Sequence, residues 1–194
     1  MTRLIGKVRS VHAGQNDDMS KEARATIELA LDGVVGDAHR SFSRRCWQGD
    51  KQPKETLRRN ERQWSAISIE ELGEICRELD LADALTATEL GANLCIEGIA
   101  ELSRLPKGTT LAFPSGAVLV VVEYNPPCLD MGKKIAATHT TQSGETLQPT
   151  AFSQAAKLTR GIVGVVDVPG TISAGEEVIV EVYEPPSWLR RSTD

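Results

Sequence analysis

The sequence has few aromatic residues and no apolar run long enough to cross a membrane. Aromatic residues make up 4% of its 194 residues, so aliphatic side chains must supply most of the core. The longest apolar run, residues 117–122, is far shorter than the roughly 18 residues of a membrane-spanning helix. Residues 1–20 also lack the apolar centre of a signal peptide. These absences predict a cytoplasmic protein with no membrane contact.

Closely spaced cysteines are also missing. The four cysteines, Cys46, Cys76, Cys95 and Cys128, form no C-x-x-C pair, which excludes a zinc ribbon and a thioredoxin-type motif. A disulfide framework is not expected in a cytosolic chain of this length. The sequence has no Walker loop or Rossmann fingerprint either, so neither ATP nor NAD is an expected ligand. A functional cysteine in this chain would therefore act alone.

The charge is low overall but concentrated in one segment. A formal net charge of −5 argues against nucleic acid as a partner, because the molecule as a whole repels phosphate backbones. Eight of the 22 Lys and Arg residues nevertheless lie between residues 39 and 62: Arg40, Arg44, Arg45, Lys51, Lys54, Arg58, Arg59 and Arg62. Such a run is often a solvated loop, but guanidinium groups also bind phosphate and sulfate bidentately. An anion site is the second interpretation, with Arg62 its best candidate where the loop re-enters regular structure.

The hydrophobic pattern predicts more strands than helices. Residues 4–12 and 25–31 alternate apolar and polar side chains, as strands with one buried face do. Ser68 and Glu71 form a capping-box pattern before apolar residues at helical spacing, which predicts a helix over about 69–80 with Cys76 on its buried face. Further strands are expected at 93–96, within 105–113, at 117–124 and in a closing hairpin over 161–183; further helices are expected from Cys128 and from a Thr150 cap to Lys157.

These elements define a fold class. The total is seven or eight strands and two or three helices, without the regular βαβ alternation of a parallel sheet. The chain is therefore predicted to be mainly β, a closed or nearly closed antiparallel β-barrel with helices at its ends. We expect one domain over residues 1–194, with a core at about 4–183 and a C-terminal tail at 184–194.

A glycine-rich turn follows the second expected strand. Gly33 and Gly36 permit tight turning and deliver Asp37 and His39 just past the strand end. One interpretation is a plain hairpin turn in which Asp37 is a turn former. The other is a site that uses the carboxylate and the imidazole, and the spacing alone favours the plain turn.

Cys128 stands apart from the other cysteines. It directly follows Pro126 and Pro127, which cannot continue a strand ladder and so place the thiol at a strand end or rim. A helix beginning there would direct backbone N–H groups at the sulfur and favour thiolate. Cysteine is nevertheless more often buried and inert than reactive, so local sequence leaves both interpretations open.

Five segments, in this order, resemble the successive motifs of MOSC domains, the molybdenum cofactor sulfurase C-terminal family: LDGVVGDAHR, RQWSAISIEEL, ELGANLCIEGI, LPKGTTLAFPSGAVLVVVEYNPPC and RGIVGVVDVPGTISAGEEVIV. The resemblance covers roughly residues 4–183. It implies a β-barrel-rich domain that binds molybdenum cofactor (molybdopterin). It also makes Cys128 the family's signature thiol, which carries sulfur as a persulfide or ligates molybdenum.

The resemblance implies further site residues. Gly36, Asp37 and His39 match the family's G-D-x-H turn, and Arg62 matches the arginine that opens its R-Q-x-S segment. The usual G-E-N is G-A-N here, which loses a carboxylate at Ala92 and keeps Asn93. The candidates for binding the cofactor phosphate are Arg40, Arg44, Arg45, Arg58, Arg59 and Arg62.

Three functional hypotheses follow from the resemblance. The first is a stand-alone domain that receives sulfur from a cysteine desulfurase or another donor and uses Cys128 as sulfur carrier or metal ligand. The second is a small molybdenum-dependent reductase of N-hydroxylated substrates, supplied by an external electron donor. The third is a family member that binds an anion or a protein and catalyses nothing. The sequence does not define the oligomeric state.

Overall fold

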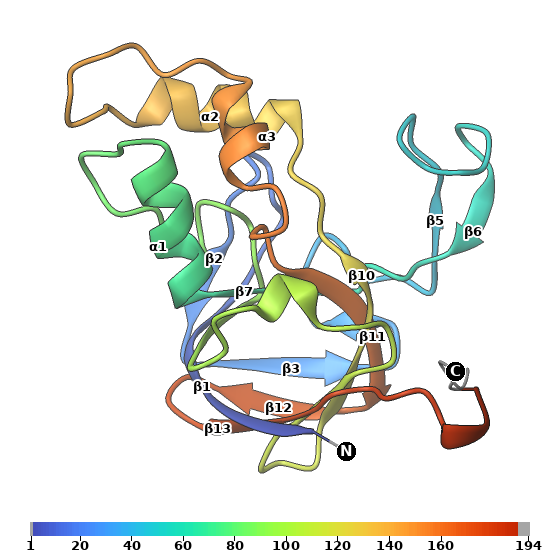
Figure 1. Cartoon of the computed structure of the whole chain (residues 1–194). Coiled ribbons are helices and arrows are strands. Elements are labelled where there is room, and N and C mark those ends of the chain that lie inside the picture. The colour runs from blue at the N-terminus through green and yellow to red at the C-terminus, as the bar shows by residue number, and fades with distance from the viewer. Residues whose placement is uncertain (1, 190–194) are drawn as a thin grey trace, which may run out of the picture.

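The computed structural model describes residues 2–189, and these form a β-barrel with helices packed at one end and a hairpin projecting beside it (Figure 1). Seven strands close the barrel in the order β13, β9, β10, β11, β7, β8 and β1, with β13 pairing back onto β1. Their bounds are Glu177–Glu181, Thr110–Ala112, Val118–Tyr124, Ile162–Val168, Trp64–Ser68, Leu94–Glu97 and Arg3–Ala13. The predicted closed barrel is confirmed.

One strand pair differs from the antiparallel expectation. β7 and β8 run parallel, whereas every other pair in the barrel is antiparallel. Parallel neighbours need a crossover between them, and here the crossover contains helix α1, Ile69–Glu78. The barrel therefore contains both parallel and antiparallel pairs, because the chain from β7 to the neighbouring strand β8 passes through the helix predicted after Ser68.

The remaining strands lie outside the closed ring. β2 (Glu22–Arg24) extends the sheet beyond β1, and β12 (Gly170–Ser173), β3 (Thr26–Ala30) and β4 (Gly33–Val34) form a second sheet. β5 (Ser43–Arg45) and β6 (Leu57–Arg59) form the projecting hairpin within the basic segment. The predicted closing hairpin is wrong: β11 and β13 lie in the barrel without pairing with each other. The chain between them pairs as β12 with β3, because Ile172 is buried in the core there.

The three α-helices of residues 2–189 lie together at one end of the barrel (Figure 1). The Ser68 cap is confirmed, since its hydroxyl accepts the Glu71 N–H at 3.1 Å and α1 then buries Leu72 and Ile75. Helix α2 spans Leu129–Thr138, so the helix predicted from Cys128 is present. Two short 3₁₀ helices span Leu102–Arg104 and Ser187–Leu189. In residues 2–189 no helix combines the length and apolar character needed to cross a membrane.

The predicted Thr150 cap is wrong. Helix α3 spans only Ala151–Ala155 and stops short of Lys157. The Thr150 backbone is already helical, with φ −78° and ψ −19°, and its side chain makes no capping hydrogen bond. A capping side chain reaches the first free N–H groups from an extended backbone, which Thr150 does not have.

Two apolar clusters stabilise the fold. The first fills the barrel and includes Trp64, Leu111 and Val180. The second lies between the helices and the outer side of β7 and β8, and includes Ile67, Ile75 and Cys95. Cys76 is only half-buried against this second cluster, and its Sγ accepts the Leu85 N–H at 3.2 Å. The second cluster fixes α2, whose first turn carries the candidate site.

Glu71, buried in α1, makes stability depend on pH. Burial raises its pKa from 4.5 to about 7, although the Ser103 N–H donates to its Oε1 at 2.7 Å. Between these pH values the folded state keeps a proton that the unfolded state loses, so stability must fall as pH rises. We expect the free energy of unfolding to drop by about 2 kcal/mol from pH 5 to pH 8 through this group, measured by urea denaturation.

The matched variant for this prediction is Glu71→Gln. Glutamine keeps the size and the acceptor oxygen of the side chain but has no titrating proton. Its pH profile is expected to be flatter than that of the native chain over the same interval. Identical profiles for the two proteins would contradict the assignment to Glu71.

Candidate functional site

Cys128 lies at the N-terminus of α2, directly after the strand β10 and two prolines. Its backbone is extended, with φ −117° and ψ 157°, and its Sγ accepts the Met131 N–H at 3.5 Å as the helix cap. It is exposed, whereas Cys46 and Cys95 are buried and Cys76 is half-buried. Burial raises the pKa of the Cys95 thiol to about 11, which keeps that sulfur protonated. Of the four cysteines, Cys128 is the one whose residue is exposed and therefore accessible to a reactant.

A cavity of about 180 Å³ opens beside this thiol. Its lining includes Cys128 and Met131 from the start of α2, and residues from six other stretches of the chain: Asn16, Met19, His39, Arg62, Trp64, Ser65, Leu90, Asn93, Asn125, Arg160 and Val163. No Asp or Glu of residues 2–189 belongs to this lining. We call this space the thiol cavity. It brings together four of the predicted residues, namely His39, Arg62, Asn93 and Cys128.

Arg160 is a residue of the thiol cavity that the sequence interpretation missed. It precedes β11 and leaves only 8% of its surface exposed. Nη2 donates to the Leu90 carbonyl at 2.5 Å, whereas Nη1 is buried without a hydrogen-bond partner. Burial lowers the pKa of Arg160 to about 10, and the charge of Cys128 opposes that shift. The guanidinium therefore stays protonated at neutral pH and attracts anions to the cavity.

Arg62 contributes the second positive charge. It lies two residues before the start of β7, and its Nη2 donates to the Asn125 Oδ1 at 2.5 Å. Glu123 lies 3.9 Å from its Nη1, and burial lowers the Arg62 pKa against the effect of that carboxylate. Asn125 comes three residues before Cys128, so this contact links the end of the basic segment to the cysteine segment. The prediction that Arg62 is the main basic site residue agrees with its position, although binding itself stays a prediction.

The G-D-x-H turn places His39 in the lining of the thiol cavity. Gly36 has φ +80°, a conformation that glycine adopts without strain. It turns the chain so that Asp37 is buried, where its Oδ2 accepts from Lys21 Nζ at 2.5 Å and from Asn93 Nδ2 at 2.9 Å. His39 Nδ1 lies 3.2 Å from the Asp37 Oδ1, which leaves the other ring nitrogen, Nε2, for a ligand.

Asp37 is thus a buried anion rather than a ligand-contacting group. Burial alone would raise its pKa, but the hydrogen bond from His39 and the charge of Lys21 hold it well below the ordinary value. Asn93 is equally occupied, since its Oδ1 also accepts the Ser65 N–H at 3.0 Å. Both residues therefore position the turn and His39.

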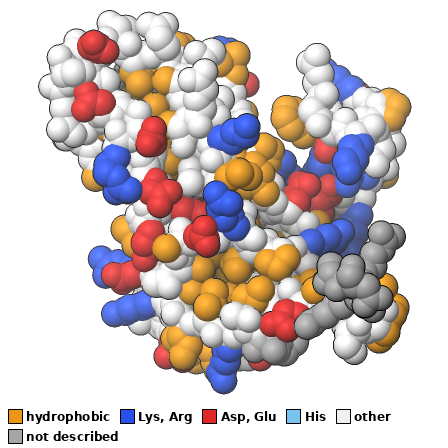
Figure 2. Space-filling view, in the orientation of Figure 1, with side chains coloured by type: hydrophobic (Ala, Val, Ile, Leu, Met, Phe, Trp, Pro, Cys, Tyr) orange, Lys and Arg blue, Asp and Glu red, His pale blue; other side chains and the backbone are white. Residues whose placement is uncertain are grey.

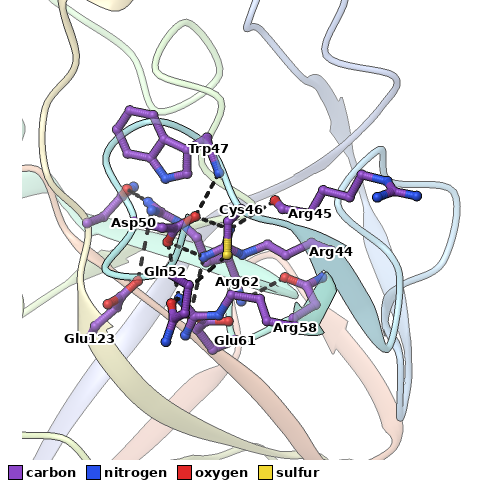
Figure 3. A network of polar contacts seen from close by, with 12 residues as sticks. Arg44, Arg45, Cys46, Trp47, Asp50, Gln52, Arg58, Glu61, Arg62 and Glu123 are labelled. Carbon is purple, nitrogen blue, oxygen red and sulfur yellow. Dashed lines mark hydrogen bonds and ion pairs between the residues drawn. The ribbon is translucent and has the colours of Figure 1, made fainter. Parts of the chain in front are cut away.

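Most arginines of the basic segment are bound to nearby carboxylates. Arg44 makes a bidentate pair with Asp50 at 2.6 and 2.7 Å, and Arg58 pairs with Asp50 and Glu61 (Figure 3). Arg40 pairs with Asp32 at 2.8 Å, and Arg45 lies 4.0 Å from Glu55. The structure does not bring these four arginines into the thiol cavity. The acidic residues of this segment pair with the arginines and stabilise the hairpin. The basic segment is thus closer to the predicted solvated loop than to an anion site, but it is ordered as a β-hairpin.

A larger hollow of about 960 Å³ lies between this hairpin and the outer face of β10 and β11. Figure 2 shows the molecule indented between the hairpin and the helical end. Val120, Val122 and Val165 form an apolar wall. Basic residues, among them Arg59, Arg62 and Lys107, and the carboxylates of Asp50, Glu61, Glu123 and Asp167 lie around it. Arg59 makes no ion pair within the described part of the chain. Arg62 lines both the hollow and the thiol cavity.

Along the chain, the G-D-x-H turn comes first, followed by Arg62, the barrel strand β10 and the Cys128 cap. The model of the MOSC domain matches residues 29–179. The chain belongs to the MOSC domain family. The MOSC model thus spans every residue of the thiol cavity except those of the segment around Asn16 and Met19.

Relatives of this MOSC domain cover nearly its whole length. YuaD of Bacillus subtilis (strain 168), a protein given a provisional role in metal-sulfur cluster biosynthesis, is 29% identical over 185 residues, which are 94% of this chain and 93% of the relative. The crystal structure of YuaD superposes with a TM-score of 0.88, at 27% identity over 94% of this chain and 99% of that chain. YiiM from Escherichia coli, at 16% identity over 95% of this chain and 71% of that chain, has a TM-score of 0.59 and shares the fold.

The Glu-to-Ala departure in the G-A-N segment of this MOSC domain lies outside the cavity. Ala92 is fully buried in the second apolar cluster, and its carbonyl is 2.9 Å from His12 Nδ1. Gly91 and Asn93, on either side, line the cavity. Position 92 therefore lies in the apolar packing behind the cavity lining.

Proposed function

We propose that this protein binds molybdenum cofactor and uses Cys128 to carry sulfur for metal-sulfur chemistry. The observation that carries the proposal is the placement of an exposed thiol, at a helix N-terminus, in a cavity that residues 2–189 line with two guanidinium groups and no carboxylate. A persulfide is anionic, so Arg62 and Arg160 would stabilise the sulfur-loaded form. The provisional role of YuaD in metal-sulfur cluster biosynthesis supports the same class of chemistry.

The residues present fit molybdenum cofactor better than a bare metal ion. Among residues 2–189, no three His, Cys, Asp or Glu side chains converge on one point, so an ion held here would have to bring most of its own ligands. Molybdenum cofactor does so, because its dithiolene already holds the metal. The hollow is within the size range of cofactor sites, about 300–1,000 Å³. Arg59, Arg62 and Lys107 would bind its phosphate, and Cys128 is a soft ligand suited to its metal.

Sulfur loading needs a donor protein, and a cysteine desulfurase is the proposed partner. The Cys128 thiolate attacks the outer sulfur of the donor's persulfide. A new S–S bond forms on Cys128 while the donor's S–S bond breaks, and the donor leaves as thiolate. The step is redox-neutral, and the exposure of Cys128 gives a partner access to it.

The proposal is tested on protein purified without oxygen from cells that make molybdenum cofactor. Intact mass spectrometry should find one extra sulfur on Cys128 after incubation with a cysteine desulfurase and cysteine. Elemental analysis should find molybdenum in the same preparation. Absence of both signals would refute the proposal and favour a family member that only binds an anion or a protein.

A second candidate is a small molybdenum reductase in which Cys128 ligates the metal. The observation that favours it is the adjacency of the hollow and the thiol cavity, which share Arg62 and together leave room for a cofactor and a small substrate. Metal-loaded protein with an artificial electron donor should then reduce an N-hydroxylated base or an amidoxime. No turnover of either compound would count against this candidate.

A further inference from the structure

The thiol cavity is too small to hold the cofactor proposed for the larger hollow. Its volume of about 180 Å³ lies below the roughly 300 Å³ at which pockets for cofactor-sized ligands begin. A water molecule occupies about 30 Å³, so the space suits a ligand of only a few heavy atoms. The cavity therefore calls for a small occupant of its own.

The charges of the cavity define the sign of that occupant. Arg62 and Arg160 contribute two guanidinium groups, and the lining contains no Asp or Glu of the described residues. Arg160 is more than nine-tenths buried, although burying a charge without a counter-ion is costly. A bound anion would supply the missing counter-charge.

An unused donor on Arg160 favours an occupant that carries oxygen acceptors. Among residues 2–189 its Nη1 has no hydrogen-bond partner, although the side chain is more than nine-tenths buried and lines the cavity. Buried polar groups in folded proteins are nearly always hydrogen-bonded, so each exception needs an explanation. An oxyanion bound in the cavity would supply the acceptor that Arg160 lacks.

The thiol selects among small oxyanions. Sulfate and phosphate offer nothing to a sulfur nucleophile, whereas thiosulfate carries a transferable sulfur atom on a sulfonate group. We propose that the thiol cavity binds thiosulfate and that Cys128 takes its outer sulfur, which makes the protein a sulfurtransferase for an inorganic donor. This inference rests on the proposed sulfur-carrier role of Cys128 and names a small-molecule substrate for the same site.

The transfer balances in atoms and electrons. The Cys128 thiolate attacks the outer sulfur of thiosulfate, the Cys128 S–S bond forms, and the S–S bond of thiosulfate breaks. Sulfite leaves with that bond's electron pair, stabilised by Arg62 and Arg160. An acceptor such as cyanide then takes the outer sulfur as thiocyanate and returns the Cys128 thiolate.

The experiment measures thiocyanate formation from thiosulfate and cyanide, together with the mass of the Cys128 peptide after thiosulfate alone. Native protein should turn over and gain one sulfur on Cys128. Arg62→Gln retains a polar group for Asn125 but loses the charge, and Arg160→Lys keeps a charge with fewer donors. For Arg62→Gln we expect kcat/KM for thiosulfate to fall by about 30-fold or more, and for Arg160→Lys to fall less.

Two controls make the result specific. Arg24→Gln removes the same charge from the exposed strand β2, which lines neither the thiol cavity nor the larger hollow, and should leave turnover of thiosulfate unchanged. A neutral sulfur donor, an organic trisulfide, should load native and Arg62→Gln protein at equal rates, which also shows that the variant is folded.

The outcomes separate this inference from the proposed function. Loading by a cysteine desulfurase without loading by thiosulfate would overturn the inference and leave the proposed function standing. Equal thiosulfate turnover by native, Arg62→Gln and Arg160→Lys proteins would overturn the anion-binding role of the cavity. Failure of both donors to load Cys128 would remove the inference together with the sulfur-carrier proposal.

Discussion

Cys128→Ser is expected to abolish sulfur loading and to reduce bound molybdenum to the background level. Serine preserves the cap, because its hydroxyl can accept the Met131 N–H that the sulfur accepts now. It cannot form a persulfide and is a poor ligand for a soft metal site. The structure should therefore remain while the chemistry disappears. Mass spectrometry after incubation with a sulfur donor, and elemental analysis of the purified protein, measure the two losses.

The matched control is Cys46→Ser. Cys46 is buried in the projecting hairpin, and its Sγ is 4.0 Å from the Gln52 Oε1. This variant should load sulfur and retain molybdenum as native protein does. Persulfide formation in Cys128→Ser would show that another cysteine is the carrier. Unchanged molybdenum in Cys128→Ser would exclude direct ligation and leave sulfur carriage as the role of the thiol.

Asp37→Ala is expected to lower the free energy of unfolding by about 3–5 kcal/mol, because it leaves the Lys21 ammonium buried without its counter-charge. The two side chains have exposed fractions of 1% for Lys21 and 0% for Asp37, and their Nζ and Oδ2 are 2.5 Å apart. Urea denaturation of the variant against native protein measures the difference. We also expect weaker anion binding, since His39 loses the partner that holds its ring.

The double variant Lys21→Met with Asp37→Leu tests the cause. Replacing both charges with apolar groups of similar size removes the unpaired ion and is often nearly neutral for stability. The double variant should therefore be more stable than Asp37→Ala alone. A double variant as unstable as Asp37→Ala would show that the hydrogen bonds that Asp37 accepts from Asn93 and His39, rather than its charge, hold this region together.

The elements that local sequence defines were predicted well. Apolar alternation located the barrel strands, and the Ser68 cap and the start of α2 at Cys128 follow from residue types at fixed spacing. Thr150 misled, since a capping residue type does not reveal whether its backbone is extended or already helical. The local pattern of apolar and polar residues does not show which strands pair with each other. The parallel pairing of β7 with β8 depends on where α1 packs, and that is a property of the whole core.

The candidate site was predicted in part for the same reason. Cys128, Arg62 and His39 stood out by residue type near a strand end or turn, and they converge in the cavity. Arg160 was missed, although it opens the RGIVG segment, because only burial makes a single arginine unusual. Conversely, the run of arginines overstated the anion site. Asp50 and Glu61 lie within the same segment, and their pairing with Arg44 and Arg58 depends on the hairpin geometry.

The pairing of β1 with β13, which closes the barrel, means that the thiol cavity is completed late in folding. Arg3 pairs with Glu181, so the first and last barrel strands meet only after almost the whole chain has left the ribosome. Pairing between such distant segments is slow, because the entropy of closing the loop is lost before the contact stabilises it. The thiol cavity draws on segments from Asn16 to Val163. A nascent chain that ends before Arg160 therefore exposes Cys128 with only one of the two cavity arginines, and the complete thiol cavity is a late product of folding.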